Sequence, residues 1–405
     1  MMQQIQIPVS KSILNRFLVL SALSDNEINL PETQLPNDVV VMHRLLFKHS
    51  GNTYNVEDAG TVFRFLTAYL SITSGEYVLS GTSTLNARPI KPLVDVLLDL
   101  GADIIYLEKE YQAPLKIKGK KIKGGEVTID GALSSQFISA LMLIAPTFDD
   151  GLKLRMLNPT SIPYLKLTQS CLHSFGIRVQ VEGNWIQVDP GQHFIKDDSA
   201  LENVEGDWSS AAFWYALCTI TKKSFSFQNL KLDSAQGDRS CASLFAKLGV
   251  ETSESNNGIS IRYTAVKSSV AEFNLADSPD LAPALVVACA LLQFNAKFYG
   301  LETLKNKESN RTAVLQSELL KLGVAFQSHF NYWNLETAGL VSKIDAEVLI
   351  LEAFNDHRIA MAFAAILTKY HNVVINEFEC VVKSYPFFWN EFEEAFHRSP
   401  SQSNL

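Results

Sequence analysis

The segment "CLHSFGIRVQVEGNWIQVDP", residues 171–190, decides the fold class of this chain. Its first part ends a helix at Gly176, since glycine is the usual left-handed stop after a helix. The part after Gly176 alternates apolar and polar residues, as half-buried strands do. An apolar helix starts upstream near Ser134 and leaves room for a strand between the two helices. The segment therefore closes a unit of apolar helix, strand, second helix, glycine and strands.

This unit recurs along the chain. Equivalent glycines are Gly51, Gly101, Gly176, Gly249 and Gly323, and equivalent apolar helices start near Lys11, Gly60, Ser134, Trp208, Asp280 and Asp356. Each glycine follows its helix start by 40 to 43 residues. A fixed spacing of this kind indicates a repeat architecture. It predicts an α/β protein with six units, the first of them shortened, in two domains of three units.

Composition limits the class of function. The chain has 405 residues and a formal net charge of −8, which disfavours general binding to nucleic acids or membrane surfaces. Apolar stretches such as 281–294 are shorter than the roughly 20 residues of a membrane span. The first ten residues lack the features of a secretory signal, so we expect a cytoplasmic protein. The five cysteines have no disulfide or zinc spacing and are expected to be reduced, structural thiols.

The starts of the six apolar helices carry the polar residues that suggest function. They read "VSKS", "EDAGT", "ALSSQ", "EGDWSS", "SPD" and "NDHR". A helix N-terminus presents free N–H groups and partial positive charge, and so favours anions. Capping explains the Ser and Asp residues, but it does not explain Lys11 and Arg358, because a cation in the first turn opposes the helix dipole.

Further charged residues extend this pattern. Arg88, Lys307, Arg311 and Lys383 add cations, and Asp280 and Glu308 are carboxylates able to exchange protons. Phosphate-binding glycine loops and the GxSxG nucleophile motif are missing from the sequence. The pattern therefore favours transfer chemistry on small anionic substrates.

In order along the chain, these motifs resemble the 5-enolpyruvylshikimate-3-phosphate synthase family. The matching pieces are "SKSILNR", "AGT", "RPI", "SSQF", "SIPY", "EGDWSSAA", "QGD", "PD", "KESNR", "NDHRIAMA" and the lysine of "VKSYP". They extend from about residue 8 to residue 390. The resemblance implies a two-domain inside-out α/β barrel with three βαβαββ units per domain. It assigns residues 1–10 and 207–405 to a discontinuous first domain and 11–206 to the second, with the active site in the cleft between them.

The resemblance also implies a reaction. The family moves the enolpyruvyl group of phosphoenolpyruvate to the 5-hydroxyl of shikimate 3-phosphate and releases phosphate, a step of chorismate and aromatic amino-acid biosynthesis. It uses no metal and no organic cofactor. The expected partners are these two small molecules, without nucleic acid or membrane, and we expect a monomer.

Residue roles follow from the same resemblance. Asp280 corresponds to the base for the 5-hydroxyl, Glu308 to the acid/base acting on the methylene carbon, and Lys11 to a third catalytic group. The expected contacts of shikimate 3-phosphate are Lys11, Ser12, Arg16, Ser134, Ser135, Gln136, Ser161, Asp280 and Lys307. Those of phosphoenolpyruvate are Lys11, Gly60, Arg88, Gln136, Arg311, Arg358 and Lys383.

Four positions depart from the family pattern. Val9 replaces a glycine, and Thr303 stands where an asparagine is usual. Asp58 replaces an asparagine of the family, and Asn310 replaces an aspartate. Asp58 places a carboxylate near an anionic substrate, which would weaken binding unless Arg64 or Arg88 pairs with it. We expect an active enzyme with altered substrate affinity.

Two alternatives remain at the level of sequence. An enolpyruvyl transferase for UDP-N-acetylglucosamine shares the fold, but it carries Asn in place of Ser12 and a reactive cysteine in its N-terminal region, whereas the first cysteine here is Cys171. The other alternative is a non-catalytic anion-binding descendant. His357 is either a substrate contact or a helix-start histidine with a structural role.

Overall fold

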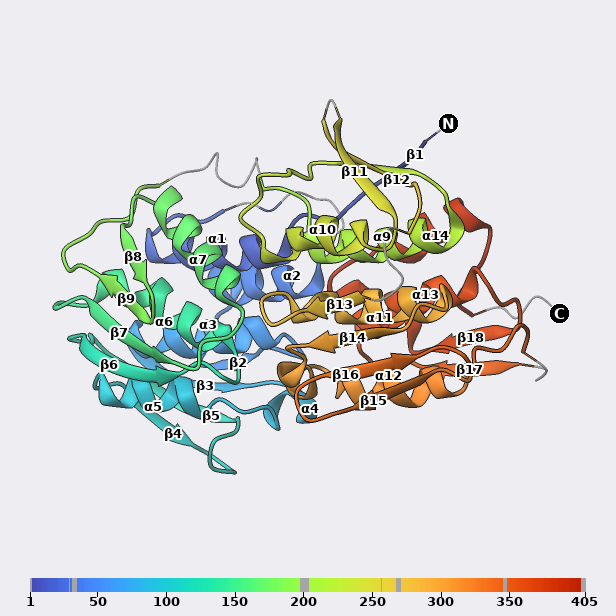
Figure 1. Ribbon diagram of the computed structural model, residues 1–405. Helices are drawn as coiled ribbons and strands as arrows, with labels where there is room; N and C mark the ends of the chain where they lie inside the picture. Colours follow the sequence, from blue (N-terminus) through green and yellow to red (C-terminus); the bar gives the residue numbers. More distant parts are fainter. Residues whose placement is uncertain are drawn as a thin grey trace. The chain divides into compact units, whose positions relative to one another are not determined.

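The computed structural model describes residues 2–28, 30, 35–196, 204–255, 257–266, 271–344 and 348–401. The chain divides into two compact units (Figure 1). Unit 1 comprises Met1–Ser10, Gln34–Pro36 and Glu205–Leu405, and unit 2 comprises Lys11–Thr33 and Asn37–Val204. Among the described residues, we find no helix that is long and apolar enough to cross a membrane.

Unit 2 alternates helices and strands. Its helices are α1 (Lys11–Leu23), α2 (Asn37–His43), the π-helix η1 (Arg44–Lys48), α3 (Gly60–Ile72), α4 (Ser83–Asn86), α5 (Lys91–Asp99), α6 (Ser135–Ile144), η2 (Ala145–Thr147) and α7 (Ile162–Ser174). Its strands are β2 (Thr53–Asn55), β3 (Gly75–Ser80), β4 (Asp103–Tyr106), β5 (Leu115–Gly119), β6 (Gly125–Asp130), β7 (Leu152–Leu157), β8 (Val179–Glu182) and β9 (Trp185–Val188).

Unit 1 follows the same plan. Its helices are α9 (Trp208–Thr221), η3 (Gly237–Ser240), α10 (Cys241–Ala246), η4 (Pro279–Leu281), α11 (Ala282–Leu291), η5 (Glu302–Asn306), α12 (Arg311–Leu320), α13 (His357–Leu367), η6 (Phe378–Lys383) and α14 (Phe388–Phe396). Its strands are β1 (Gln3–Ile5), β10 (Phe225–Gln228), β11 (Val250–Ser255), β12 (Gly258–Tyr263), β13 (Ala271–Asn274), β14 (Ala296–Tyr299), β15 (Ala325–Ser328), β16 (Trp333–Glu336), β17 (Leu349–Glu352) and β18 (Val373–Asn376).

Four sheets have one topology. Their strand orders are β1-β10-β12-β11, β13-β14-β16-β15, β2-β3-β5-β4 and β6-β7-β9-β8. In each, the first two strands are parallel and the last two form an antiparallel hairpin. A fifth sheet consists only of the parallel pair β17-β18. The structure therefore repeats one βαβαββ unit.

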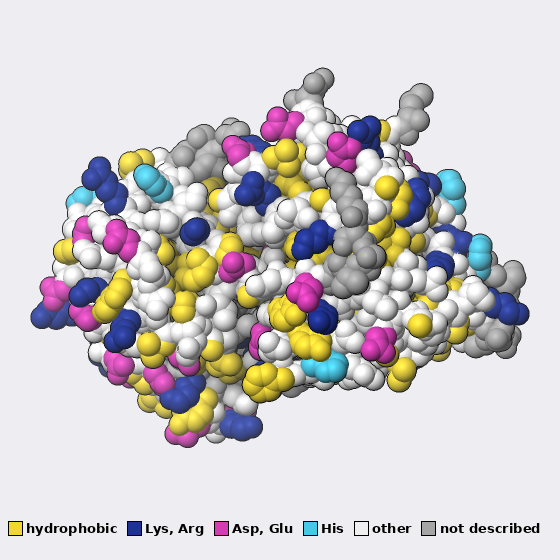
Figure 2. Space-filling view, viewed as in Figure 1, with side chains coloured by type: hydrophobic (Ala, Val, Ile, Leu, Met, Phe, Trp, Pro, Cys, Tyr) yellow, Lys and Arg dark blue, Asp and Glu magenta, His cyan; other side chains and the backbone are white. Residues whose placement is uncertain are grey.

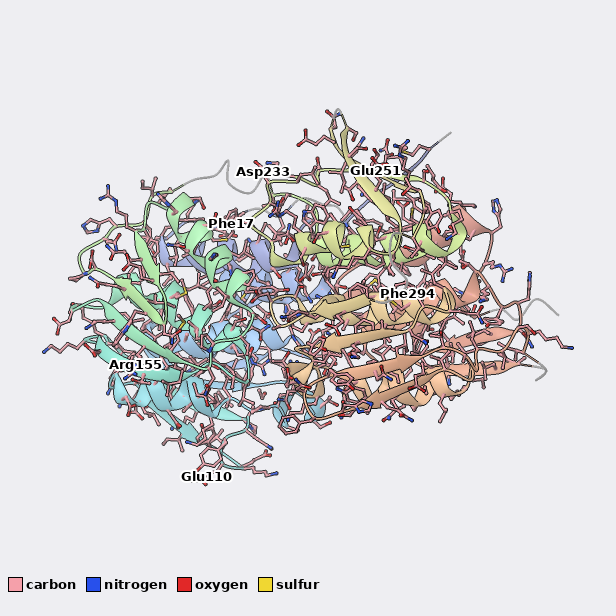
Figure 3. All side chains as sticks on the ribbon, in the orientation of Figure 1. Phe17, Glu110, Arg155, Asp233, Glu251 and Phe294 are labelled. Carbon is pink, nitrogen blue, oxygen red and sulfur yellow. The ribbon has the colours of Figure 1, made fainter. Side chains whose placement is uncertain are left out.

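The predominantly apolar helices form the core of each unit. In unit 1, α9, α11 and α13 contact one another. All residues of α11 and α13 are buried, as are those of α9 from Trp208 to Thr219. In unit 2, α1, α3 and α6 contact one another in the same way, and Phe17 of α1 (labelled in Figure 3) packs edge-on against Phe175 at 5.6 Å. Helices that are apolar all round are buried helices, which places the sheets outside them.

The predicted glycine stops are confirmed. All five glycines are left-handed, with φ between +77° and +121°. Six units were predicted, the first of them shortened, and among the described residues four of the six have a closing hairpin. Among the described residues, no closing hairpin follows Gly51, because the next strand, β2, already begins the following sheet, and none follows η6, where α14 packs instead.

Two segments that are distant in sequence pair at the boundary of the units. Val9 forms an antiparallel bridge with Gly206, Ser10 N–H donates to the carbonyl of Glu205 (2.9 Å), and Asp207 N–H donates to the carbonyl of Pro8 (2.9 Å). The β-branched side chain of Val9 suits this extended pairing. The chain thus leaves and re-enters unit 1 through two hydrogen-bonded segments.

The surface carries charges of both signs. On the face shown in Figure 2, Lys and Arg side chains are interspersed with Asp and Glu. Pairs such as Lys121–Asp149, Arg262–Glu251 and Lys153–Glu126 are solvent-exposed, and Glu251 is labelled in Figure 3. Exposed pairs of this kind contribute little to stability.

Candidate active site

Asp280 is held by three cations in unit 1. It lies in η4, at the start of the apolar helix α11. Its Oδ1 contacts Lys307 Nζ (3.1 Å) and Arg311 Nη1 (2.9 Å), and its Oδ2 contacts Arg358 Nη2 (3.1 Å). Burial raises the pKa of this carboxyl, but the positive charges of Arg358, Lys307 and Arg311 outweigh burial and hold the pKa well below its usual range. Asp280 is therefore ionised and able to accept a proton.

Glu308 is held in the same way at the other side of Arg311. Its Oε2 contacts His357 Nδ1 (2.6 Å) and, more distantly, Arg311 Nη2 (3.8 Å), while its Oε1 contacts Lys383 Nζ (3.1 Å). Burial raises the pKa of Glu308, but the charges of His357 and Lys383 outweigh it and bring the pKa well below its usual range. The His357–Glu308 pair forms a short, charge-assisted hydrogen bond that can carry a proton.

Asp356 anchors the arginine between these two carboxylates. It accepts from Arg311 Nε (2.7 Å) and Nη2 (3.0 Å), and it caps α13 by accepting from Arg358 N–H (3.0 Å). Asp356 is fully buried and Arg311 is 2% exposed. The bidentate contact fixes the plane of the guanidinium group, so that its Nη1 faces Asp280.

A further buried carboxyl, Asp238, belongs to the same electrostatic group. It accepts a hydrogen bond from Ser209 Oγ at the start of α9, and its Oδ1 is buried without a hydrogen-bond partner. Burial and the negative charge of Asp280 raise the pKa of Asp238 to about 6, against the opposing charge of Arg358. The pKa of Asp238 is thus higher than that of an ordinary aspartate, and the pKa of Asp280 is lower.

Glu308, Asp356 and His357 offer ligand atoms within 4.8 Å of one another, as a metal site would. Arg311 contacts both carboxylates, and Lys383 contacts Glu308. Two cations at this distance oppose the entry of a divalent ion. The donor set is therefore better suited to charge pairing than to metal binding.

The loop before α13 has an unusual backbone. Phe354 (φ 53°) and Asn355 (φ 51°) are both left-handed, and so is Glu377 (φ 57°) directly before η6. The left-handed region costs a residue with a Cβ about 1–2 kcal/mol. Asn355 donates to the two carboxylate oxygens of Glu377, from its N–H and its Nδ2, both at 2.9 Å.

In unit 2, Lys11 begins α1 and contacts Asp38 of α2 (Nζ to Oδ2, 3.0 Å). Asp38 is 3% exposed, and its Oδ1 has no hydrogen-bond partner. The side chain of Lys11 is 12% exposed. Unlike Asp280 and Glu308, the Lys11–Asp38 pair is a single ion pair.

Arg16 of α1 is buried among neutral acceptors. It donates to Thr168 Oγ1 (2.8 Å), the Ser12 carbonyl (2.7 Å) and Ser139 Oγ (3.3 Å). Within the described ranges it has no carboxylate partner, and burial lowers its pKa. A buried guanidinium without a counter-charge is costly, because desolvation is not offset by an opposite charge.

Arg64 and Arg88 lie against the start of α3. Arg64 is 3% exposed and donates to the carbonyl of Gly60 (2.9 Å), and burial together with the charge of Arg88 lowers its pKa well below its usual range. A Cβ at Gly60 would lie 2.6 Å from Nη1 of each arginine. Only glycine therefore allows both guanidinium groups to approach this helix N-terminus.

The serines expected from sequence lie at three helix starts of unit 2, and Ser12 is the second residue of α1. Ser134 caps α6 by accepting from Gln136 N–H (3.2 Å), Ser135 is buried, and Gln136 Nε2 donates to Thr61 Oγ1 (3.0 Å). Ser161 precedes α7 in the left-handed conformation (φ 54°). The structure thus brings Gln136 to the start of α3, beside Gly60.

Of the departures from the family pattern, Asp58 and Asn310 make local hydrogen bonds, whereas nothing in the described structure explains Thr303. Asp58 accepts a hydrogen bond from Thr82 Oγ1. Asn310 caps α12 by accepting from Ala313 N–H (3.2 Å), a role that asparagine and aspartate fill equally well. Thr303 Oγ1 is buried without a hydrogen-bond partner in the structure.

The sequence indicated no role for Asp356 or Asp238, and it suggested Arg64 only as a partner of Asp58. Asp356 had a signal, since it is the N-cap residue beside His357. For Asp238 the only signal in the sequence was the short "QGD" motif that contains it. His357, for which two roles were open, contacts Glu308 directly.

Comparison with known proteins identifies the family of this chain. The model of the family "EPSP synthase (3-phosphoshikimate 1-carboxyvinyltransferase)" matches residues 33–392. The chain belongs to the EPSP synthase family. A 3-phosphoshikimate 1-carboxyvinyltransferase of Bacteroides fragilis is 36% identical over 398 residues, covering 96% of this chain and 94% of that protein. One from Haemophilus influenzae is 30% identical, covering 96% and 95%.

Solved structures of EPSP synthases have a similar fold. An EPSP synthase structure from Acinetobacter baumannii superposes with a TM-score of 0.73 at 20% identity, covering 98% of this chain and 96% of the other. The chain has the two-domain inside-out α/β fold of EPSP synthases, as the sequence resemblance implied. It is an enzyme of the transferase class, in the shikimate pathway of aromatic amino-acid biosynthesis.

Proposed function

We propose that this protein transfers the enolpyruvyl group of phosphoenolpyruvate to the 5-hydroxyl of shikimate 3-phosphate and releases phosphate. Membership of the EPSP synthase family supports the reaction. The observation that carries the proposal is the pair of partly buried, ionised carboxylates, Asp280 and Glu308, which contact the cations Lys307, Arg311, Arg358 and Lys383. Such a set combines proton transfer with the neutralisation of anionic substrates.

Proton transfer is divided between the two carboxylates. Asp280 takes the proton of the 5-hydroxyl as that oxygen attacks C2 of phosphoenolpyruvate. Glu308 first receives a proton from His357 and then gives it to the methylene carbon C3, so that C2 becomes electrophilic. When the phosphate leaves C2, Glu308 takes a proton back from C3 and the double bond re-forms. The proton that Glu308 gives is thus recovered, and the proton that Asp280 takes leaves with the released phosphate.

The cations bind the substrates' negative groups. For phosphoenolpyruvate we propose Arg311, Arg358 and Lys383 in unit 1, and Lys11, the backbone of Gly60, Arg88 and Gln136 in unit 2. For shikimate 3-phosphate we propose Lys307 and Asp280 in unit 1, and Lys11, Ser12, Arg16, Ser134, Ser135, Gln136 and Ser161 in unit 2. Buried arginines with neutral partners, such as Arg16, support this role because a bound anion would supply the missing counter-charge.

We take units 1 and 2 as the two family domains, with Lys11 as a third catalytic group at their boundary. The amide-to-carboxylate change at Asp58 is proposed to alter the affinity for phosphoenolpyruvate. Because one chain supplies all of the proposed contacts, we propose a monomer acting on small molecules in the cytoplasm. Gel filtration and cell fractionation test these last points.

The experiment is an assay of phosphate release from phosphoenolpyruvate, with shikimate 3-phosphate as acceptor. Release that depends on both substrates is the expected result. Binding of shikimate 3-phosphate without release would instead identify a non-catalytic descendant. A parallel reaction with UDP-N-acetylglucosamine tests the other transferase, which the family assignment does not favour.

A further inference from the structure

We propose that Glu377 is a positioning residue, which sets the distance between the two groups that hold Glu308. The inference rests on the proposed function, because it assigns Glu308 a proton-transfer role. Glu377 itself lies outside the group of charges that contacts Asp280 and Glu308 in the described structure. Its effect on the reaction would therefore be transmitted through other residues.

The two partners of Glu308 come from separate segments. His357, on Oε2, is the first residue of α13. Lys383, on Oε1, is the last residue of η6. The position of the carboxylate therefore depends on how the start of α13 is placed relative to η6.

Glu377 joins these two segments directly. It precedes η6, and its carboxylate accepts from the N–H and the Nδ2 of Asn355, both at 2.9 Å. Asn355 in turn precedes Asp356, the N-cap of α13. One carboxylate thus fixes both the backbone and the side chain of the residue that leads into the His357 helix.

Local stability alone does not account for this link. Phe354, Asn355 and Glu377 are all left-handed, and the pair is solvent-exposed. Hydrogen bonds in water return little net free energy, whereas the left-handed region penalises Phe354 and Glu377, although asparagine tolerates it. From this strained backbone beside His357 and Lys383 we infer a constraint from function.

A neighbouring pair provides the contrast. Asn376 Nδ2 donates to Glu352 Oε1 (2.9 Å) and Oε2 (3.2 Å), and these two residues are already partners in the β17–β18 ladder. That contact is also exposed, but it joins strands that backbone hydrogen bonds hold together. Glu352 therefore serves as a matched control for Glu377.

The test compares Glu377→Gly with Glu352→Gln in the full-length protein. Glycine suits the left-handed backbone at residue 377 but removes the carboxylate, so the variant should unfold at the same temperature as the wild type or a higher one. We expect its kcat/KM for phosphoenolpyruvate to fall about 10-fold or more, because misplaced reacting groups lose rate steeply. Binding of shikimate 3-phosphate alone should change by less than about twofold, since that ligand does not need Glu308. Glu352→Gln should change neither quantity.

A second readout is independent of turnover. The NMR titration of the His357 ring in the ligand-free protein reports its contact with Glu308, and we expect it to move in Glu377→Gly but not in Glu352→Gln. Glu377→Asp, which keeps a carboxylate on a shorter side chain, should restore part of the rate. An unchanged His357 titration, or an unchanged kcat/KM in an active enzyme, overturns the proposal. Should the wild type itself release no phosphate, the proposed function fails, and the His357 titration alone decides the role of Glu377.

Discussion

Asp356 holds Arg311 through two parallel hydrogen bonds, from Nε at 2.7 Å and from Nη2 at 3.0 Å, and both side chains are buried. The same carboxylate caps α13 and also accepts from Ser309 Oγ (3.0 Å). One residue thus joins a helix start, a loop and the cation that lies between Asp280 and Glu308. Its removal would leave Arg311 with fewer counter-charges in a buried site.

We therefore expect Asp356→Ala to lower the free energy of unfolding by about 3–5 kcal/mol, the usual result of breaking a buried ion pair from one side. Urea unfolding monitored by fluorescence measures this loss. Asp356→Asn keeps an acceptor for the α13 cap and should lose less. Equal losses in the two variants would mean that the charge of Asp356 is unimportant.

Asp280→Ala should reduce kcat by about 10² or more, because it removes the proposed base for the 5-hydroxyl. Calorimetry should show that shikimate 3-phosphate still binds within a few-fold of the wild-type affinity. Asp277, an exposed aspartate three residues upstream, provides the control, and Asp277→Ala should retain full activity. Undiminished turnover in Asp280→Ala would refute the role assigned to Asp280.

Asp238 should make stability depend on pH in the direction opposite to Asp280. A carboxyl whose pKa is raised on folding binds protons more tightly in the folded state, so its contribution to stability falls as pH rises from about 4 to about 6. For Asp238 the loss is on the order of 3 kcal/mol at neutral pH. Asp280 and Glu308, with lowered pKa values, instead contribute stability that is lost as pH falls below about 4.

Asp238→Asn removes the first effect and leaves the second. Relative to the wild type, the variant should therefore gain stability between pH 4.5 and pH 7, as measured by urea unfolding at both values. Asparagine retains an oxygen that can accept from Ser209. A difference between variant and wild type that is the same at both pH values would contradict the prediction.

Gly60→Ala should raise the KM for phosphoenolpyruvate, because the new Cβ would lie 2.6 Å from the guanidinium groups of Arg64 and Arg88. The arginine side chains must move to relieve this contact, whereas the carboxylates of unit 1 are unaffected. Steady-state kinetics should show an increase of about 10-fold or more for phosphoenolpyruvate. The KM for shikimate 3-phosphate serves as the internal control, and an equal rise in both would point to general misfolding.

The sequence predicted what depends on local chemistry. Gly176 and Gly323 stop helices because only glycine enters the left-handed region without strain, and the helix starts at Lys11, Gly60 and Trp208 were located to the residue. These features are set by a few neighbouring residues.

Contacts between distant segments could not be read in the same way. Asp58 accepts a hydrogen bond from Thr82, a residue 24 positions away whose contact no local pattern indicated. Asp356 reaches Arg311 across 45 residues, and nothing in either neighbourhood specifies the other. In the described part of the chain no closing hairpin follows Gly51, and the glycine spacing does not encode which strands pair.

The two solvent-excluded guanidinium groups of unit 2, Arg16 and Arg64, have a consequence for how the protein is handled. Without a bound anion they lower the stability of the fold, and ligand binding raises it by RT ln(1 + [L]/Kd). Buffers containing phosphate or sulfate should accordingly protect the purified enzyme against heat and proteases. Inside a cell, the supply of its substrates would then influence how long each molecule survives as well as how fast it turns over.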